Sequence, residues 1–116
     1  KRLGGGMRQS GILAAAALHG LEHHLPLLAK DHERAKRFAE AVAKAPGVSV
    51  VPPDTNIVMV DLLEGQLSSK VADKARKNGV LALGWNDTRV RCVFHLDVDD
   101  AATDLAAEVM TAALAR

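Results

Sequence analysis

Residues 56–62 read Asn-Ile-Val-Met-Val-Asp-Leu, and this run decides the fold. Successive side chains of a strand point to opposite faces, so a run this rich in β-branched and apolar residues predicts a strand that is mainly apolar on both faces. In a half-polar edge strand, apolar residues would alternate with polar ones. Residues 56–62 are therefore predicted to be a strand around which the neighbouring segments pack.

Helical and extended patterns flank this run on both sides. Apolar residues recur at helical spacing in residues 9–25, 27–45, 66–77 and 99–115. Short apolar runs predict further strands at residues 48–51, 80–83 and 89–95. The predicted order of elements is α-α-β-β-α-β-β-α.

This order predicts an α/β (α+β) fold, in which a helical connecting segment is followed by a small, three- to four-stranded, mainly antiparallel sheet with helices packed on one face. We expect two regions: residues 1–46, with a glycine-rich loop and connecting helices, and residues 47–116, a small C-terminal αβ domain. The chain has 116 residues, which is long enough to bury a real hydrophobic core.

Local signals describe the first and last helices. Ser10 is available to cap the first helix, and Pro26 should end or kink it. Residues 11–17 contain only Gly, Ile, Leu and Ala, so nearly the whole circumference of this stretch could be buried against a close neighbour. The spacing in the last helix predicts an inward face that comprises Ala102, Leu105, Val109 and Ala112.

Composition argues against several classes of function. A formal net charge of +1 offers no general attraction to nucleic acid, and two Phe, one Trp and no Tyr provide no platform for stacking bases. No apolar run reaches membrane length. The single cysteine precludes an intrachain disulfide and favours a reducing, cytoplasmic setting. The chain begins Lys-Arg without Met, as a fragment of a longer protein would.

Residues 1–11 read Lys-Arg-Leu-Gly-Gly-Gly-Met-Arg-Gln-Ser-Gly and lead directly into the first predicted helix. Three glycines permit positive φ and leave backbone N–H groups unobstructed, and the basic side chains Lys1, Arg2 and Arg8 add positive charge. A phosphate or carboxylate would suit such a loop. The run matches neither the Rossmann nor the P-loop spacing, so a hinge or a close-packing site is favoured over an anion site, and both interpretations stay open.

Other polar residues favour structural roles. His19 and His23 are four residues apart on a helix, a spacing that can chelate a metal, but no carboxylate is placed to complete the ligand set, and solvated or capping histidines are favoured. Cys92 lies between apolar residues on a predicted strand face, which indicates a buried, inert thiol. Helix capping is favoured over metal binding for the acidic residues before the last helix, Asp97, Asp99 and Asp100.

Arg91 is the strongest candidate for a binding residue. Strand alternation places it on the face opposite to Cys92. If that face is covered, the guanidinium needs an anionic partner, because burying an unpaired charge is very costly. Its planar fork suits a carboxylate held through two hydrogen bonds. The alternatives are that the face is open to solvent or that an acidic side chain of the chain itself is the partner.

Three stretches together resemble a known family. Residues 1–16, with the Gly-Gly-Gly-Met-Arg-Gln run, resemble the segment that follows the catalytic-lysine loop of low-specificity L-threonine aldolases, which are pyridoxal-phosphate enzymes of the aspartate-aminotransferase fold. Residues 54–60 and 91–98 resemble a small-domain strand and a late arginine strand of the same family, in the same order. The resemblance covers essentially the entire chain.

The resemblance implies a function and assigns roles. It implies pyridoxal 5′-phosphate as cofactor and a retro-aldol cleavage of L-threonine or L-allo-threonine to glycine and acetaldehyde. Arg91 matches the position that grips the carboxylate of the amino-acid substrate. Arg8 and Lys1 match basic positions that border the cofactor near a subunit interface. No metal site is implied.

The resemblance also implies that part of the site lies outside this chain. None of its lysines has the Ser-Lys-Gly context of the Schiff-base lysine, so the chain alone is predicted to be inactive, as the C-terminal part of an aldolase. Its expected partners are an N-terminal large domain, the amino-acid substrate and further subunits of a homo-oligomer. The sheet face that bears Arg91 is then expected to be exposed in this chain or covered by self-association.

Two other functions stay open at this point. The chain could be the small domain of a related lyase that performs β-elimination on tryptophan, tyrosine or cysteine derivatives. It could also be a non-catalytic interaction domain made of a helical hairpin on a small sheet.

Overall fold

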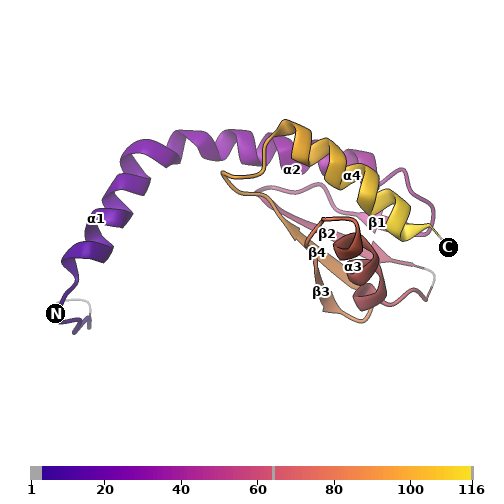
Figure 1. Ribbon diagram of the computed structural model, residues 1–116, viewed down its shortest axis with the longest axis horizontal. Coiled ribbons are helices and arrows are strands. Elements are labelled where there is room, and N and C mark those ends of the chain that lie inside the picture. Colours follow the sequence, from indigo (N-terminus) through magenta and orange to yellow (C-terminus); the bar gives the residue numbers. More distant parts are fainter. Residues whose placement is uncertain (1–3, 64, 116) are drawn as a thin grey trace.

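A long helical arm leads into a compact domain (Figure 1). The computed structural model describes residues 4–63 and 65–115. The arm begins with α1 (Gly11–His19), continues through the π-helical turn η1 (Gly20–His24) and the 3-10 turn η2 (Leu25–Leu27), and joins α2 (Leu28–Val42). Helical structure therefore continues past the proline predicted to end or kink it.

The compact domain contains four strands and two further helices. In chain order these elements are β1 (Val48–Val50), β2 (Ile57–Leu62), α3 (Ser68–Lys77), β3 (Leu83–Asn86), β4 (Arg89–Val93) and α4 (Asp100–Leu114). The strands form one sheet in the order β1-β2-β4-β3, and every neighbouring pair is antiparallel. Helices α2, α3 and α4 cover one face of it (Figure 1). The predicted fold class is confirmed.

The core lies between these helices and the covered face of the sheet. Val58 and Val60 of β2 and Val90 of β4 are fully buried there, against Phe38 of α2 and Met110 of α4. α2 thus shares the hydrophobic core of the compact domain. The division of the chain into residues 1–46 and 47–116 stays a prediction.

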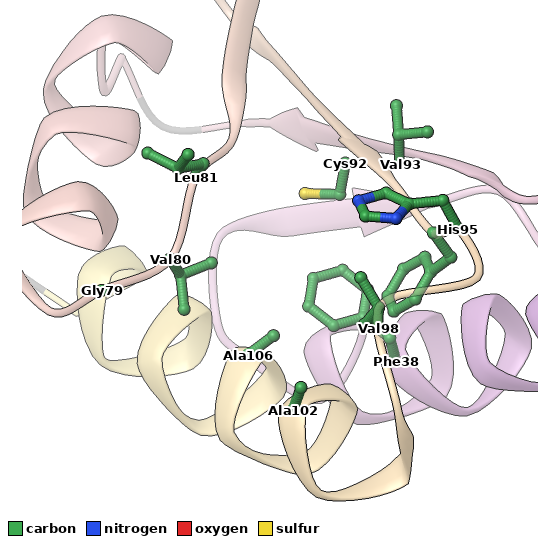
Figure 2. Close-up of a pocket in the computed structure, with 11 residues that line it drawn as sticks. Phe38, Gly79, Val80, Leu81, Cys92, Val93, His95, Val98, Ala102 and Ala106 are labelled. Carbon is green, nitrogen blue, oxygen red and sulfur yellow. The ribbon is translucent and has the colours of Figure 1, made fainter.

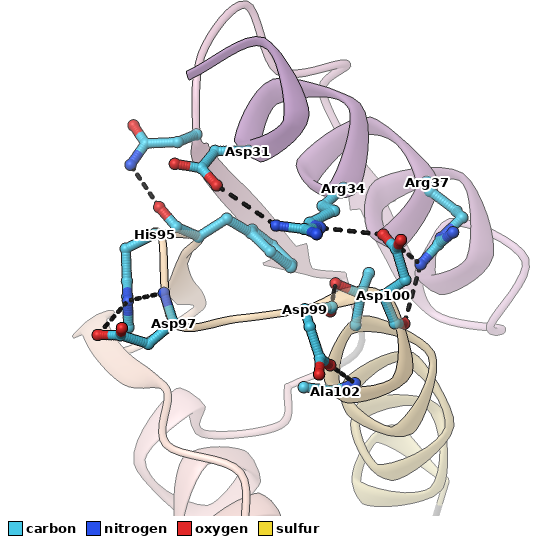
Figure 3. A network of polar contacts seen from close by, with 11 residues as sticks. Asp31, Arg34, Arg37, His95, Asp97, Asp99, Asp100 and Ala102 are labelled. Atoms are coloured by element: carbon cyan, nitrogen blue, oxygen red, sulfur yellow. Dashed lines mark hydrogen bonds and ion pairs between the residues drawn. The ribbon is translucent and has the colours of Figure 1, made fainter. Parts of the chain in front are cut away.

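The predicted inward face of α4 is correct for Val109, which is half-buried against the core, and wrong for Ala102, Leu105 and Ala112, which are exposed. Thr103, Met110 and Leu114 are buried, whereas Leu105 is exposed. The buried face of α4 is thus rotated about the helix axis relative to the prediction. An ion pair outside the core accompanies this rotation, with Arg34 Nε 2.9 Å from Asp100 Oδ1 (Figure 3). A helix held at its first turn by α2 turns its larger Met and Leu side chains inward, where they bury more apolar area than Ala102 or Ala112 would.

The predicted side-chain cap is present at the start of the last helix and absent at the start of the first. Asp99 Oδ1 accepts a 2.8 Å hydrogen bond from the backbone N–H of Ala102, as an N-cap does (Figure 3). Ser10 makes no side-chain hydrogen bond to α1, and its own backbone is already helical. The prediction of a Ser10 cap is therefore wrong, because a capping side chain needs a non-helical backbone at its position.

The third strand lies later in the chain than its predicted position at residues 80–83. β3 begins at Leu83 and runs through most of residues 84–88, the turn that connects the strands predicted at residues 80–83 and 89–95. Its end is tied to the first residue of α3: Ser68 Oγ donates to the carbonyl of Asn86, and Ser68 N–H donates to the carbonyl of Asp87 at 2.8 Å. Contacts between residues this far apart along the chain are invisible to a strand pattern.

The arm packs little against the rest of the described chain. α1 has no buried residue, and Ile12 is 82% exposed. The prediction that this stretch could be buried on nearly all sides therefore has no neighbour within the described residues to satisfy it. Pro26 lacks an N–H and cannot continue the regular ladder, which explains the π and 3-10 turns around it. Within residues 4–63 and 65–115, every helix is too short or too polar to cross a membrane.

Candidate functional site on the open face of the sheet

The second face of the sheet, called the open face below, carries the candidate site. Arg91 of β4 lies directly opposite Met59 of β2 on one side and Leu83 of β3 on the other. Cys92 points to the covered face, as predicted from strand alternation. None of the described helices packs on the open face. β2 has apolar residues on both faces, but only those on the covered face belong to the core.

Two arginines on the open face have different partners. Arg89 pairs with Asp61 on the adjacent strand, through Nε to Oδ1 at 2.5 Å and Nη2 to Oδ2 at 3.0 Å. This hydrogen-bonded carboxylate raises the pKa of Arg89 above its usual value. No described carboxylate lies within 4.0 Å of the Arg91 guanidinium. Of the alternatives for Arg91, an open face is therefore what the structure has, and the acidic partner belongs to Arg89.

Arg91 is instead held by an aromatic ring. Its guanidinium carbon lies 5.3 Å from the ring centroid of Trp85, a cation–π distance. A cation–π contact is made to the ring as a whole and not to a hydrogen-bond acceptor, so it does not occupy the N–H donors of the guanidinium as a carboxylate does. Arg91 is thus oriented without being neutralised.

Arg91 lines an open hollow of about 360 Å³ on this face. The other lining residues are Leu81, Ala82, Leu83, Val93 and His95. The His95 Nδ1 lies 3.6 Å from Asp97 Oδ2 (Figure 3). One planar cation among apolar walls is suited to a small carboxylate that carries a short side chain.

A second cavity, of about 270 Å³, lies on the covered side between β4 and α4 (Figure 2). Phe38, Val80, Val98 and Ala106 line it together with Cys92. Burial raises the pKa of the Cys92 thiol to about 12, so the thiol is protonated at neutral pH. The prediction of a buried thiol is confirmed, and this cavity lacks a nucleophile of the activated kind.

The glycine loop forms a third hollow, of about 500 Å³, lined by Gly5, Gly6, Met7, Arg8 and Ser10. Gly4 has φ of +85°, which favours glycine. A Cβ on Gly5 or Gly6 would meet nothing within 4 Å, so close packing against the described chain does not explain them. Lys1 lies outside the described residues. Arg8 and the unobstructed backbone donors suit a phosphate group.

The structure does not bring the predicted site residues together. The loop with Arg8 is at the free end of the arm, whereas β4 with Arg91 lies in the compact domain at the other end (Figure 1). Any site that uses both residues needs protein from outside the described chain.

The histidines on the arm remain solvent-facing. His19 and His23 are exposed, with ring centroids 4.4 Å apart. Among the described residues no group of three or more His, Cys, Asp or Glu side chains is arranged to hold a metal ion.

Trp85 is the site residue that the sequence pattern missed. It falls in the stretch assigned to a turn, and the bulge that aims it is not visible in a strand pattern. The available signal was compositional, since it is the only tryptophan in a chain with 3% aromatic residues and lies six positions before Arg91.

Comparison with known proteins supplies the family. The family model for beta-eliminating lyases matches residues 1–64. The chain belongs to the beta-eliminating lyase family. It is 44% identical over 101 residues to low-specificity L-threonine aldolase 1 of Arabidopsis thaliana, a match that covers 82% of this chain and 28% of that protein.

Two further relatives span the same region. The low specificity L-threonine aldolase of Escherichia coli (strain K12) is 39% identical over 98 residues, covering 84% of this chain and 28% of that protein. The alanine racemase TOXG of Cochliobolus carbonum is 34% identical over 107 residues, covering 84% of this chain and 27% of that protein. This chain therefore spans a little over a quarter of the length of these curated relatives.

Proposed function

We propose that this chain is the C-terminal small domain of a pyridoxal-phosphate-dependent L-threonine aldolase, which cleaves L-threonine or L-allo-threonine to glycine and acetaldehyde. The observation that carries the proposal is Arg91, an arginine without a carboxylate partner among the described residues, oriented on the open face in an apolar hollow. The aldolase names of the relatives support the reaction.

Arg91 binds and orients the substrate. Two in-plane N–H groups donate to the substrate carboxylate, which fixes the direction of the Cα–Cβ bond relative to the rest of the site. Leu83 and Val93 line the same hollow, and once a large domain covers this face they would help to keep water from the pair and strengthen the charge-assisted hydrogen bonds. Asp61 keeps Arg89 occupied, so the carboxylate meets one cation rather than two.

The glycine loop fits part of the cofactor. Arg8 and the backbone donors of the loop are a donor set for the phosphate of pyridoxal 5′-phosphate, and Lys1 is proposed to border the same group. When bound, this cofactor would supply an electron sink for cleavage of the Cα–Cβ bond.

The chain alone is proposed to be inactive. The described lysines lie on or beside α2 and α3 rather than on the open face, and they are Lys30, Lys36, Lys44, Lys70, Lys74 and Lys77. We propose that a large domain N-terminal to this region supplies the Schiff-base lysine and covers the open face. A homo-oligomer would supply the neighbour for the exposed arm. Buried Cys92 is consistent with the cytoplasmic setting proposed for the enzyme.

Assays of the full-length enzyme test the proposal. We expect acetaldehyde release from L-threonine or L-allo-threonine when pyridoxal 5′-phosphate is present, and none from residues 1–116 purified alone. Absence of cleavage by the full-length enzyme, with β-elimination from tryptophan, tyrosine or cysteine derivatives instead, would support the related lyase. The TOXG match adds alanine racemisation as a second candidate activity, and the same protein should be assayed for it. Loss of all these activities would leave an interaction domain.

A further inference from the structure

Trp85 is fixed at a β-bulge beside the candidate carboxylate site. Gly84 pairs with Val90 and Asn86 pairs with Arg89, so Trp85 is an extra residue on β3 without a partner on β4. Bulges of this kind re-aim a side chain and are common next to active sites. Here the bulged residue presents its indole to the guanidinium of Arg91.

The backbone on both sides of the bulge is held by α3. A Cβ on Gly84 would lie 2.9 Å from Ser68 Oγ, so only glycine allows β3 to approach α3 this closely. After the bulge, Ser68 Oγ donates to the carbonyl of Asn86, and the amide of Thr88 donates to Asn86 Oδ1 at 3.0 Å. Trp85 therefore stands between two anchored residues, although its side chain is 54% exposed.

We infer that Trp85 is a positioning residue for Arg91: its ring restrains the guanidinium through a cation–π contact at 5.3 Å and leaves the N–H donors free for a carboxylate. The inference rests on the proposed function, because the ligand is the carboxylate of the amino-acid substrate. Asp61 does the comparable work for Arg89 with hydrogen bonds, which consume donors, whereas an aromatic ring leaves them free.

The full-length enzyme and three variants test this role. Trp85→Leu keeps apolar bulk without a π face, Trp85→Phe restores an aromatic ring, and Leu105→Ala removes an exposed apolar side chain on α4 as the control. Calorimetry gives the dissociation constant for glycine, and steady-state assays give KM and kcat for threonine. We expect Trp85→Leu to raise the dissociation constant and KM about two- to fivefold with kcat little changed, and Trp85→Phe to recover most of the loss.

A double-mutant cycle separates positioning from bulk. In an Arg91→Ala background, Trp85→Leu should change glycine binding no further, because the guanidinium it orients is gone. An equal loss in both backgrounds, or equal binding by Trp85→Leu and the wild type, would overturn the role of Trp85 while leaving the aldolase activity intact. A wild-type enzyme that binds no glycine and cleaves no threonine would overturn the proposed function, and this role with it.

Discussion

Four consecutive residues, in β4 and just after it, alternate between the two faces of the sheet. Cys92 and Phe94 point to the helices and are 7% and 3% exposed, whereas Arg91 and Val93 point to the open face. The covered face has a close-packed apolar core. On the open face Arg89 is paired with Asp61, and Arg91 lies against the ring of Trp85 without an ion-pair partner among the described residues. Alternate positions of one strand therefore contribute to the core on one face and to the proposed carboxylate site on the other.

The largest effect is expected when neighbouring residues on opposite faces are truncated and their losses of stability are compared. Phe94→Ala should lower the free energy of unfolding by about 3–5 kcal/mol, because its ring packs 5.3 Å from that of Phe38 and the truncation leaves a cavity. Val93→Ala, on the open face and 44% exposed, should cost less than about 1 kcal/mol. Urea denaturation measures both. Equal costs would show that the open face is part of a second core.

Arg91→Ala tests the functional side of the comparison. In the full-length enzyme it should raise KM and lower kcat/KM, because a charge-assisted pair with the substrate carboxylate is lost. The loss in kcat/KM should correspond to about 2–4 kcal/mol of transition-state stabilisation. The melting temperature should change little, since no described carboxylate loses a partner. Steady-state kinetics measured with a thermal melt would detect both effects. Unchanged kinetics would remove Arg91 from the site.

Cys92→Ser tests the covered face without changing its shape. A hydroxyl in this apolar cavity should lower the free energy of unfolding by about 1–3 kcal/mol and leave kcat/KM nearly unchanged. The wild-type thiol should also react with a thiol reagent only after unfolding, because its pKa near 12 keeps it protonated. Rapid reaction in the native state would contradict the burial of this residue.

The smallest effect is expected at the rim of the helix layer. Hydrogen bonding and ion pairing with Arg34 lower the pKa of Asp100, so this contribution to stability is present above the ordinary carboxyl pKa and is lost as pH falls below about 4. Asp100→Asn should therefore show a weaker decline in melting temperature between neutral pH and pH 3 than the wild type. Glu108→Gln, also on α4, is the control. A decline as steep as in the wild type would argue against the ion pair.

Most elements could be predicted because they depend on neighbours in the sequence. The alternation on β4 and the cap at Asp99 are set by residues one to three positions apart, and both are confirmed. The buried face of α4 could not be predicted in this way, because its rotation accompanies a contact with Arg34, which is 66 positions away. The point at which β3 ends involves a contact with Ser68, which is 18 positions from Asn86.

The candidate site also combines features that follow from the local sequence with features that depend on tertiary contacts. Strand alternation was sufficient to place Arg91 on the face opposite to Cys92, with an anionic partner expected only if that face is covered. Which arginine obtained the internal carboxylate depended on the register that sets Asp61 against Arg89. The aromatic contact to Arg91 depended on the bulge at Trp85.

Local periodicity was enough to predict the kinds and order of the elements and the two faces of the strands, and side-chain chemistry was enough to propose Arg91 as a carboxylate-binding residue. Only the tertiary structure decided which face the helices cover, where β3 begins and which ring lies against Arg91. Those outcomes depend on packing and hydrogen bonds between residues far apart in the chain, and their free energies appear only once the chain has folded.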